Sequence, residues 1–306
     1  MKIHKIGFLV FISLLVLGSC KKPKEGCLDP TAINYDASAE YNSLCIYGSK
    51  VPVVPVDTPT VPCDTCGPVK LHKVEISITP MANGKRFYFG TNYKDDQLRD
   101  FQITFFKYFV SNIKLGDKST VKTDVADIEL IDYDTSTFLS ATRPIYDYII
   151  EGEASAGMYN RIFLGLGVDP IWNEEYSPND YPSDHPLNAT YTNMDWTWET
   201  KYKFTSIEGN IDSDADGKYD RAFFMHTGFS DLYRQAIVRT GSEIEVKEGL
   251  TTFINLELDI VKVFEGLDIA TKEGQTHTSG AEQLEFSRTI QTNMAKSITF
   301  VGVTYE

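Results

Sequence analysis

The composition of the chain changes at Val69, and this change limits what the chain can fold into. Before it, residues 49–68 contain so many prolines that they cannot form a strand ladder, because proline has no backbone N–H. After it, apolar residues alternate with polar ones, as at Val74, Ile76 and Ile78, which is the period of a half-buried β-strand. Many short strands separated by turn residues follow, and they predict an all-β fold, a β-sandwich over residues 69–306.

Two segments depart from this strand pattern. A polar loop over residues 169–193 carries four prolines, and loops of this length inside a compact domain are usually functional. One or two helical turns are expected over residues 281–295, where Leu284, Ile290 and Met294 recur at helical spacing. We therefore expect a sandwich with one long functional loop and a little helix.

The first twenty residues predict export and lipidation. Residues 1–19 have the layout of a signal peptide, with two lysines, an apolar run and then Gly-Ser before Cys20. The run is too short for a comfortable membrane span, and the segment ending at Cys20 resembles a bacterial lipobox. We expect Cys20 to carry a lipid anchor, and Lys21-Lys22 give no inner-membrane retention signal. The expected location is the outer membrane, on its periplasmic or surface face.

Residues 20–68 are interpreted as a lipidated tether that contains a small disulfide module and a Pro-rich linker. Four further cysteines, an even number, predict disulfides in an exported protein. The most local pairing joins Cys27 to Cys45 and Cys63 to Cys66, although sequence alone does not fix connectivity. Residues 21–48 resemble a short disulfide module of exported bacterial proteins. The tether itself is expected to have no chemistry.

Charge and missing motifs exclude several functions. The chain has 29 basic and 43 acidic residues and a formal charge of −14. Phosphate contacts need a basic face, so nucleic acid is not an expected partner. The sequence contains no Gly-x-Ser-x-Gly, no His-Glu-x-x-His and no glycine-rich phosphate loop. We therefore expect a binding protein and not an enzyme.

Histidines and tryptophans gather in one part of the chain. His185 is followed by Trp196 and Trp198, which point to the same face of a strand, and His226 ends the next predicted strand. Histidines brought together across strands commonly build a transition-metal site, so His185 and His226 are predicted ligands beside a tryptophan. His277, in a polar loop, is a candidate third ligand. The competing interpretation is rim histidines and core aromatics.

A second candidate cation site has a different chemistry. Asp212, Asp214, Asp216 and Asp220 have the spacing of a calcium loop, with Gly217 at the sharp turn. Phe223 stands where a complete EF-hand loop has its bidentate glutamate. The other interpretation is an acidic hairpin turn between two strands.

Five phrases, taken in order, are similar to those of one protein family, MbnP. They are Y-F-V-S-N-I-K-L (108–115), Y-N-R-I-F-L-G-L-G-V-D (159–169), H-P-L-N (185–188), M-D-W-T-W-E-T-K-Y-K-F (194–204) and H-T-G (226–228). The resemblance spans roughly residues 69–303, which is nearly the whole predicted sandwich. Two departures stand out, because Lys201 occupies a position that is usually glycine and Asp195 replaces a common aromatic residue.

The resemblance implies a function in copper handling. Proteins of this family are copper-binding proteins associated with methanobactin operons and are also found elsewhere. The resemblance implies a mononuclear copper site made of histidines and a tryptophan oxidised to kynurenine by a MauG-like di-haem cytochrome c peroxidase. Either Trp196 or Trp198 could be that tryptophan, and Trp198 is preferred here.

A different class of function remains open on the sequence alone. The tether, the β-architecture and the aromatic residues of the loop also fit a surface lipoprotein that binds glycans or adheres to a partner. Calcium at residues 212–220 would stabilise such a module. Metal analysis separates the two hypotheses, because copper supports the first and calcium alone supports the second.

Overall fold

The computed structural model describes most of the chain from Val69 onward. The described residues are 25–26, 36–38, 41–42, 69–117, 120–133, 148–188, 192–196, 201–278 and 281–306. The predicted signal peptide, Cys20, the Pro-rich linker and the cysteines proposed for disulfides (Cys27, Cys45, Cys63, Cys66) lie outside them. In the tether, β1 (Glu25–Gly26) pairs in parallel with β2 (Tyr41–Asn42). No helix among the described residues is long and apolar enough to cross a membrane.

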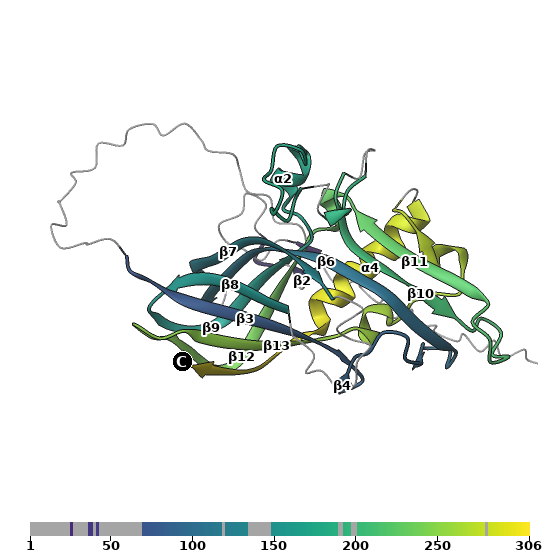
Figure 1. Cartoon of the computed structure of the whole chain (residues 1–306), viewed down its shortest axis with the longest axis horizontal. Coiled ribbons are helices and arrows are strands. Elements are labelled where there is room, and N and C mark those ends of the chain that lie inside the picture. Colours follow the sequence, from purple (N-terminus) through teal and green to yellow (C-terminus); the bar gives the residue numbers. More distant parts are fainter. Residues whose placement is uncertain are drawn as a thin grey trace, which may run out of the picture.

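The domain is built from two β-sheets, which confirms the predicted all-β architecture (Figure 1). The larger sheet has the order β12-β9-β6-β10-β11-β14, with β5 and β7 also paired to β6. Its strands are β5 (Tyr93–Lys94), β6 (Asp100–Asp117), β7 (Thr120–Asp132), β9 (Gly157–Leu166), β10 (Lys203–Ile211), β11 (Arg221–Gly228), β12 (Arg234–Val246) and β14 (Gln275–Thr276). The smaller sheet has the order β15-β13-β3-β4, with β8 paired to β3. Its strands are β3 (Leu71–Ala82), β4 (Lys85–Arg86), β8 (Tyr148–Ser155), β13 (Thr252–Asp259) and β15 (Ile298–Tyr305).

The long strand β6 links the sandwich to an extension of the larger sheet. Tyr108 of β6 pairs with β10 and with β7, so these two strands lie on opposite edges of β6. Val110 pairs with β9 and with β7, so β9 also lies opposite β7. It follows that β9 and β10 succeed one another along the same edge. The β10–β11–β14 part therefore projects beyond the sandwich, at the right of Figure 1.

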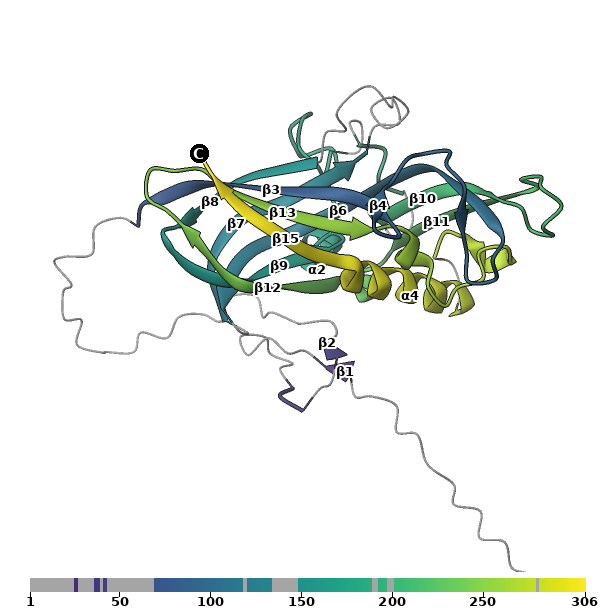
Figure 2. The same ribbon diagram turned by 90° about the horizontal axis from the view of Figure 1, so that it is seen from below.

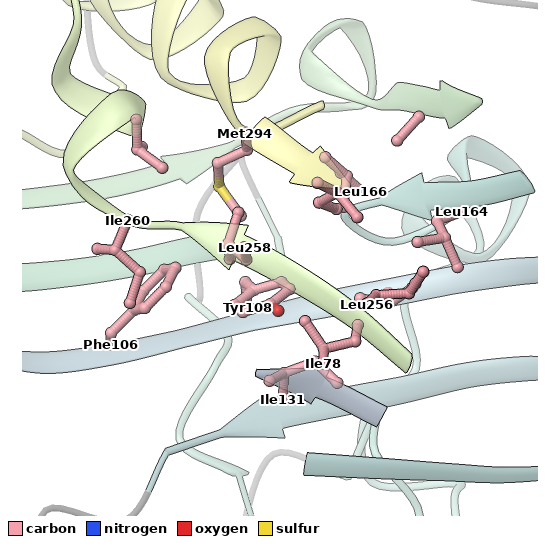
Figure 3. Close-up of a cluster of buried hydrophobic side chains, with 14 of the residues drawn as sticks. Ile78, Phe106, Tyr108, Ile131, Leu164, Leu166, Leu256, Leu258, Ile260 and Met294 are labelled. Atoms are coloured by element: carbon pink, nitrogen blue, oxygen red, sulfur yellow. The ribbon is translucent and has the colours of Figure 1, made fainter. Parts of the chain in front are cut away.

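The core lies between the two sheets and is formed by the alternating apolar residues. Val74, Ile76 and Ile78, which define the predicted alternation, are fully buried. Figure 3 shows part of this core, where side chains from both sheets meet. Its labelled residues are Ile78, Phe106, Tyr108, Ile131, Leu164, Leu166, Leu256, Leu258, Ile260 and Met294.

The helical segment near the C-terminus is longer than the one or two turns expected from the sequence. Helix α4 (Ala281–Ser297) buries Ile290 and Met294 in the main core. The side-chain amide of Gln291 donates to Thr205 of β10 at 2.8 Å and to Thr227 of β11 at 2.6 Å. Helix α4 therefore covers one face of the β10–β11 extension, and Figure 2 shows it running along these strands.

Candidate metal centre

His226 lies on the face of β11 that points away from α4. Neighbouring residues of a strand point to opposite faces, and Thr227 points to α4. In β10, Ser206 is paired with His226 and Glu208 with Phe224, so these four side chains share the face away from the helix. A polar group on this face is not covered by the buried interface with α4.

Strand β14 brings His277 to His226. Gln275 and Thr276 pair in parallel with Phe224 and Met225 of β11, and the same register continued by one residue sets His277 beside His226. The Nδ1 atoms of the two imidazoles lie 3.2 Å apart. The rings also pack against the ring of Phe224, whose centroid lies 4.8 Å from that of His277. The sequence made His277 a candidate third ligand, and the structure brings it into contact with His226.

Burial keeps both imidazoles in the neutral form. The side chain of His226 is 13% exposed, and burial lowers its pKa, against the opposing effect of Glu208. Burial likewise lowers the pKa of His277, and the charge of Lys203 acts in the same direction. A neutral imidazole offers a nitrogen lone pair, which is the form that binds metals.

Glu208, in the neighbouring strand β10, binds the other ring nitrogen of His226. Its Oε1 atom lies 2.9 Å from Nε2 of His226, and its side chain is 44% exposed. The two ring nitrogens of His226 therefore face different partners, the carboxylate on one side and His277 on the other. The sequence interpretation missed Glu208. The sequence feature that could have identified Glu208 is the acidic turn around Asp216. A hairpin centred on this turn pairs residue 206 with residue 226 and residue 208 with residue 224, so Glu208 lies on the same face as His226.

Trp196 closes the site from above the sheet. The backbone N–H of Trp196 donates to the carbonyl of Lys201, and that of Lys203 donates to the carbonyl of Met194, so residues 194–196 run back along the start of β10. With this backbone pairing, the indole ring of Trp196 lies 5.8 Å from the ring of His277 and 6.1 Å from that of His226, measured between ring centroids. Trp196 is only 8% exposed. The ammonium group of Lys203 lies 5.5 Å from the centroid of the indole.

The loop that carries Trp196 is fixed at its other end by a partly buried polar network. The amide of Asn112 donates to Asp169 at 2.6 Å and to the hydroxyl of Tyr233 at 3.0 Å. The other carboxylate oxygen of Asp169 accepts from the N–H of Ile171 and so caps α2 (Pro170–Glu174). Asn112 and Asp169 belong to two of the five phrases whose resemblance to a known family is described above, so these phrases specify the scaffold under the loop.

Helix α2 is in turn tied to the segment that follows β11. Asn173 donates to Ser230 of the 3-10 helix η1 (Ser230–Leu232) at 3.1 Å, and its side-chain oxygen accepts from the N–H of Tyr202 at 3.3 Å. The ammonium group of Lys201 bonds to the carboxylate of Glu174 at 2.8 Å. The end of the loop that enters β10 is therefore held beside β11.

The donor set fits one metal ion. A metal–imidazole bond is about 2.0 Å long, so two nitrogens bound to one ion are at most roughly 4 Å apart. The 3.2 Å between the Nδ1 atoms of His226 and His277 meets this condition. The rings of Trp196 and Phe224 flank the same place. Two neutral imidazoles in an aromatic enclosure suit a borderline transition metal.

His185 is not part of this group, which corrects the expected pairing of His185 with His226. Its ring stacks on that of Tyr181 with 4.3 Å between centroids, and its Nδ1 accepts from the N–H of Leu187 at 3.0 Å. Burial lowers the pKa of His185, and the nearby charge of Asp127 in β7 has a smaller, opposite effect on that pKa. Strands β7 and β11 are three strand spacings apart, roughly 14 Å.

The prediction for His185 failed because contacts inside the loop decide where the loop residues lie. The stack on Tyr181 keeps the imidazole over the side of the sheet that carries β7. Of the two tryptophans singled out, Trp196 reaches the site, and Trp198 lies outside the described residues. The structure thus brings together His226, His277 and Trp196, which all come from different segments.

The acidic loop between β10 and β11 brings three of its four carboxylates together. Oxygen atoms of Asp212, Asp214 and Asp216 all lie within 4.8 Å of one another. Asp212 is 3% exposed and its oxygens accept from the N–H groups of Asp216 and Gly217. Asp220 instead binds Ser213 through both carboxylate oxygens. The loop is thus a closed turn with one cluster of carboxylates.

Comparisons with known proteins agree with the resemblance seen in the sequence. No curated protein matches the chain. Among solved structures, it is similar to MbnP from Methylosinus trichosporium, with a TM-score of 0.47 and 17% identity, over 66% of this chain and 80% of that one. The family model of MbnP matches residues 72–280, which is more than half of the chain. The chain therefore belongs to the MbnP family.

Proposed function

We propose that the protein binds one copper ion between the Nδ1 atoms of His226 and His277, and that copper binding, without catalysis, is its function. Membership of the MbnP family supports a copper-associated role. The observation that carries the proposal is the 3.2 Å separation of two part-buried imidazole nitrogens. Among divalent first-row ions, copper binds nitrogen sites most tightly, so an unselective pair of imidazoles in an exported protein would take copper first.

Trp196 is the side chain best placed to supply a third donor. Indole is a poor ligand, because its nitrogen lone pair belongs to the ring, whereas kynurenine offers an aromatic amine and a ketone. We infer that Trp196, rather than the Trp198 preferred from sequence, is the residue oxidised. The support is that its ring faces both imidazoles.

The oxidation requires a partner, and the family resemblance suggests a MauG-like di-haem peroxidase. The indole would give up four electrons and four protons, which reduce two molecules of hydrogen peroxide to four of water at the peroxidase. Two water molecules would supply the oxygen atoms that open the five-membered ring to N-formylkynurenine. Hydrolysis then releases formate and leaves kynurenine. Trp196 is 8% exposed, so the electrons would leave through the protein and not by direct contact with a haem.

The proposed setting is the cell envelope. The layout of residues 1–20 supports export and lipidation at Cys20, with the Pro-rich linker as a spacer between membrane and domain. The copper site would then face an oxidising compartment, and the disulfides proposed for Cys27, Cys45, Cys63 and Cys66 belong to the same setting.

Copper titration of the purified domain tests the proposal. Wild-type protein should bind one copper per chain, and protein purified from cells that contain the peroxidase should show the mass of kynurenine in the peptide that holds Trp196. Binding of no copper would overturn the copper site. Bound copper with an unmodified Trp196 would overturn only the kynurenine.

The acidic loop supports a second, smaller proposal. We infer that Asp212, Asp214 and Asp216 bind calcium, because their carboxylate oxygens converge within 4.8 Å. This would stabilise the β10–β11 hairpin, and it is the remaining support for a calcium-stabilised surface module that binds glycans or adheres to a partner. Calcium should raise the melting temperature of wild-type protein and leave that of Asp212→Asn unchanged. An equal effect on both proteins would mean that the loop is only a turn.

A further inference from the structure

The hydrogen bond between Glu208 and His226 determines which nitrogen of His226 is free. A carboxylate can only accept hydrogen bonds, so the Nε2 atom that lies 2.9 Å from Oε1 of Glu208 must carry the proton. A neutral imidazole, which is the form that binds a metal, has only this one N–H. The lone pair of His226 is therefore on Nδ1, the atom that faces His277.

We propose that Glu208 is the positioning residue of the site, because it holds His226 in the Nε2–H tautomer with its Nδ1 lone pair directed at the metal position. This inference rests on the proposed copper site. Histidine ligands commonly donate their second N–H to a carboxylate, which fixes the ring orientation and makes the ligand nitrogen more basic. Glu208 does not touch the metal position itself, since the nitrogen it binds is on the far side of the ring.

Because of the same hydrogen bond, the two histidines carry their protons on different ring nitrogens in the metal-free protein. Because Nδ1 of His226 has no proton, the 3.2 Å contact is a hydrogen bond only if Nδ1 of His277 donates it. To bind a metal through Nδ1, His277 must move its proton to Nε2, whereas His226 is already in the binding form. His277 can make this change because no hydrogen bond to its Nε2 is present among the described residues.

A hydrogen bond to the backbone of β11 also fixes the position of His277 relative to His226. The hydroxyl of Thr278 donates to the carbonyl oxygen of His226 at 2.9 Å, so the segment that carries His277 is bound directly to β11. Glu208 and His226 lie on two paired strands of the same hairpin. Both partners of the hydrogen bond are thus on regular structure, which limits the movement of the imidazole ring.

Nitrogen-15 NMR of the histidines in the metal-free protein tests this inference independently of copper. Wild-type His226 should be the Nε2–H tautomer. Glu208→Gln, whose amide oxygen still accepts a hydrogen bond, should keep that tautomer, and Glu208→Leu should give a mixture with Nδ1–H. Glu245→Gln is a matched control, since Glu245 is also a strand carboxylate and is 49% exposed.

Copper titration of the same variants completes the test. Glu208→Leu should bind copper about 10- to 100-fold more weakly than wild type, Glu208→Gln should lose less, and the control should lose nothing. Thermal unfolding of each variant separates this effect from a loss of fold. An unchanged tautomer in Glu208→Leu, or wild-type copper affinity in that variant, would overturn the role of Glu208. If wild-type protein binds no copper but the tautomers behave as described, the copper site fails and the positioning of His226 stands.

Discussion

The Nδ1 atoms of His226 and His277 lie 3.2 Å apart, although 51 residues separate the two histidines in the sequence. Their proximity comes from main-chain pairing, because β14 joins the free edge of β11 in parallel. The side chains therefore meet without depending on a long loop between them. A site built in this way is present before any ligand binds, so the protein need not fold around the metal.

Copper binding should be insensitive to pH near neutrality and weaken in mild acid. Burial lowers the pKa of His226 and of His277 below the usual value of about 6.5, so both rings are already neutral at pH 7. Protons compete with the metal for the imidazole nitrogens only as the pH falls below about 6.5. Affinity measured from pH 8 to pH 5 with a copper-chelating dye should be constant to about pH 6.5 and then decrease. A decrease that begins above pH 7 would contradict the lowered pKa values.

Copper should quench the fluorescence of Trp196. The ring centroid of Trp196 lies 6.1 Å from that of His226 and 5.8 Å from that of His277, and paramagnetic copper(II) held between these imidazoles is expected to quench a nearby indole. In protein made without the peroxidase, Trp196→Phe should lose most of the copper-dependent fluorescence change. Trp172→Phe is the control, because Trp172 lies in α2 and packs against the cluster that contains Phe109 and Leu232. Equal quenching in the two variants would place copper away from Trp196.

The strand pattern could be predicted from the sequence, but the partner of His226 could not. Alternation of Val74, Ile76 and Ile78 indicated a β-strand because one face of that strand is buried. Strand β14 has two residues, too few for any alternation, and its pairing with β11 depends on how the later segments pack. His277 could therefore be identified as a candidate but not paired with His226.

The departure at Lys201 has a structural explanation. Lys201 has a φ of 58°, which is the left-handed region that glycine adopts most easily, and the family usually has glycine at this position. Its ion pair with Glu174 and the hydrogen bond from Trp196 to its carbonyl hold this conformation. His185, in contrast, could not be placed from sequence, because the path of its loop depends on packing between side chains such as Tyr181.

Gly165→Ala should destabilise the domain. A Cβ atom at Gly165 would overlap the hydroxyl of Tyr233 and approach the carbonyl oxygen of Ser111 to 2.8 Å, and the hydroxyl cannot move away without losing its hydrogen bond from Asn112. We expect a loss of about 1–3 kcal/mol in the free energy of unfolding, measured by urea denaturation. Gly302→Ala is the control, because no heavy atom lies within 4 Å of its added Cβ. Equal stability of the two variants would contradict this packing.

The measurement that tests the copper site most directly is the copper content after equilibrium dialysis of wild type and three single alanine variants. Wild type and His185→Ala should each retain one copper per chain. His226→Ala and His277→Ala should each lose more than the roughly 10- to 100-fold in affinity that removal of a supporting residue costs. Stoichiometric, wild-type copper binding by His277→Ala would contradict the site, and so would loss of copper from His185→Ala alone.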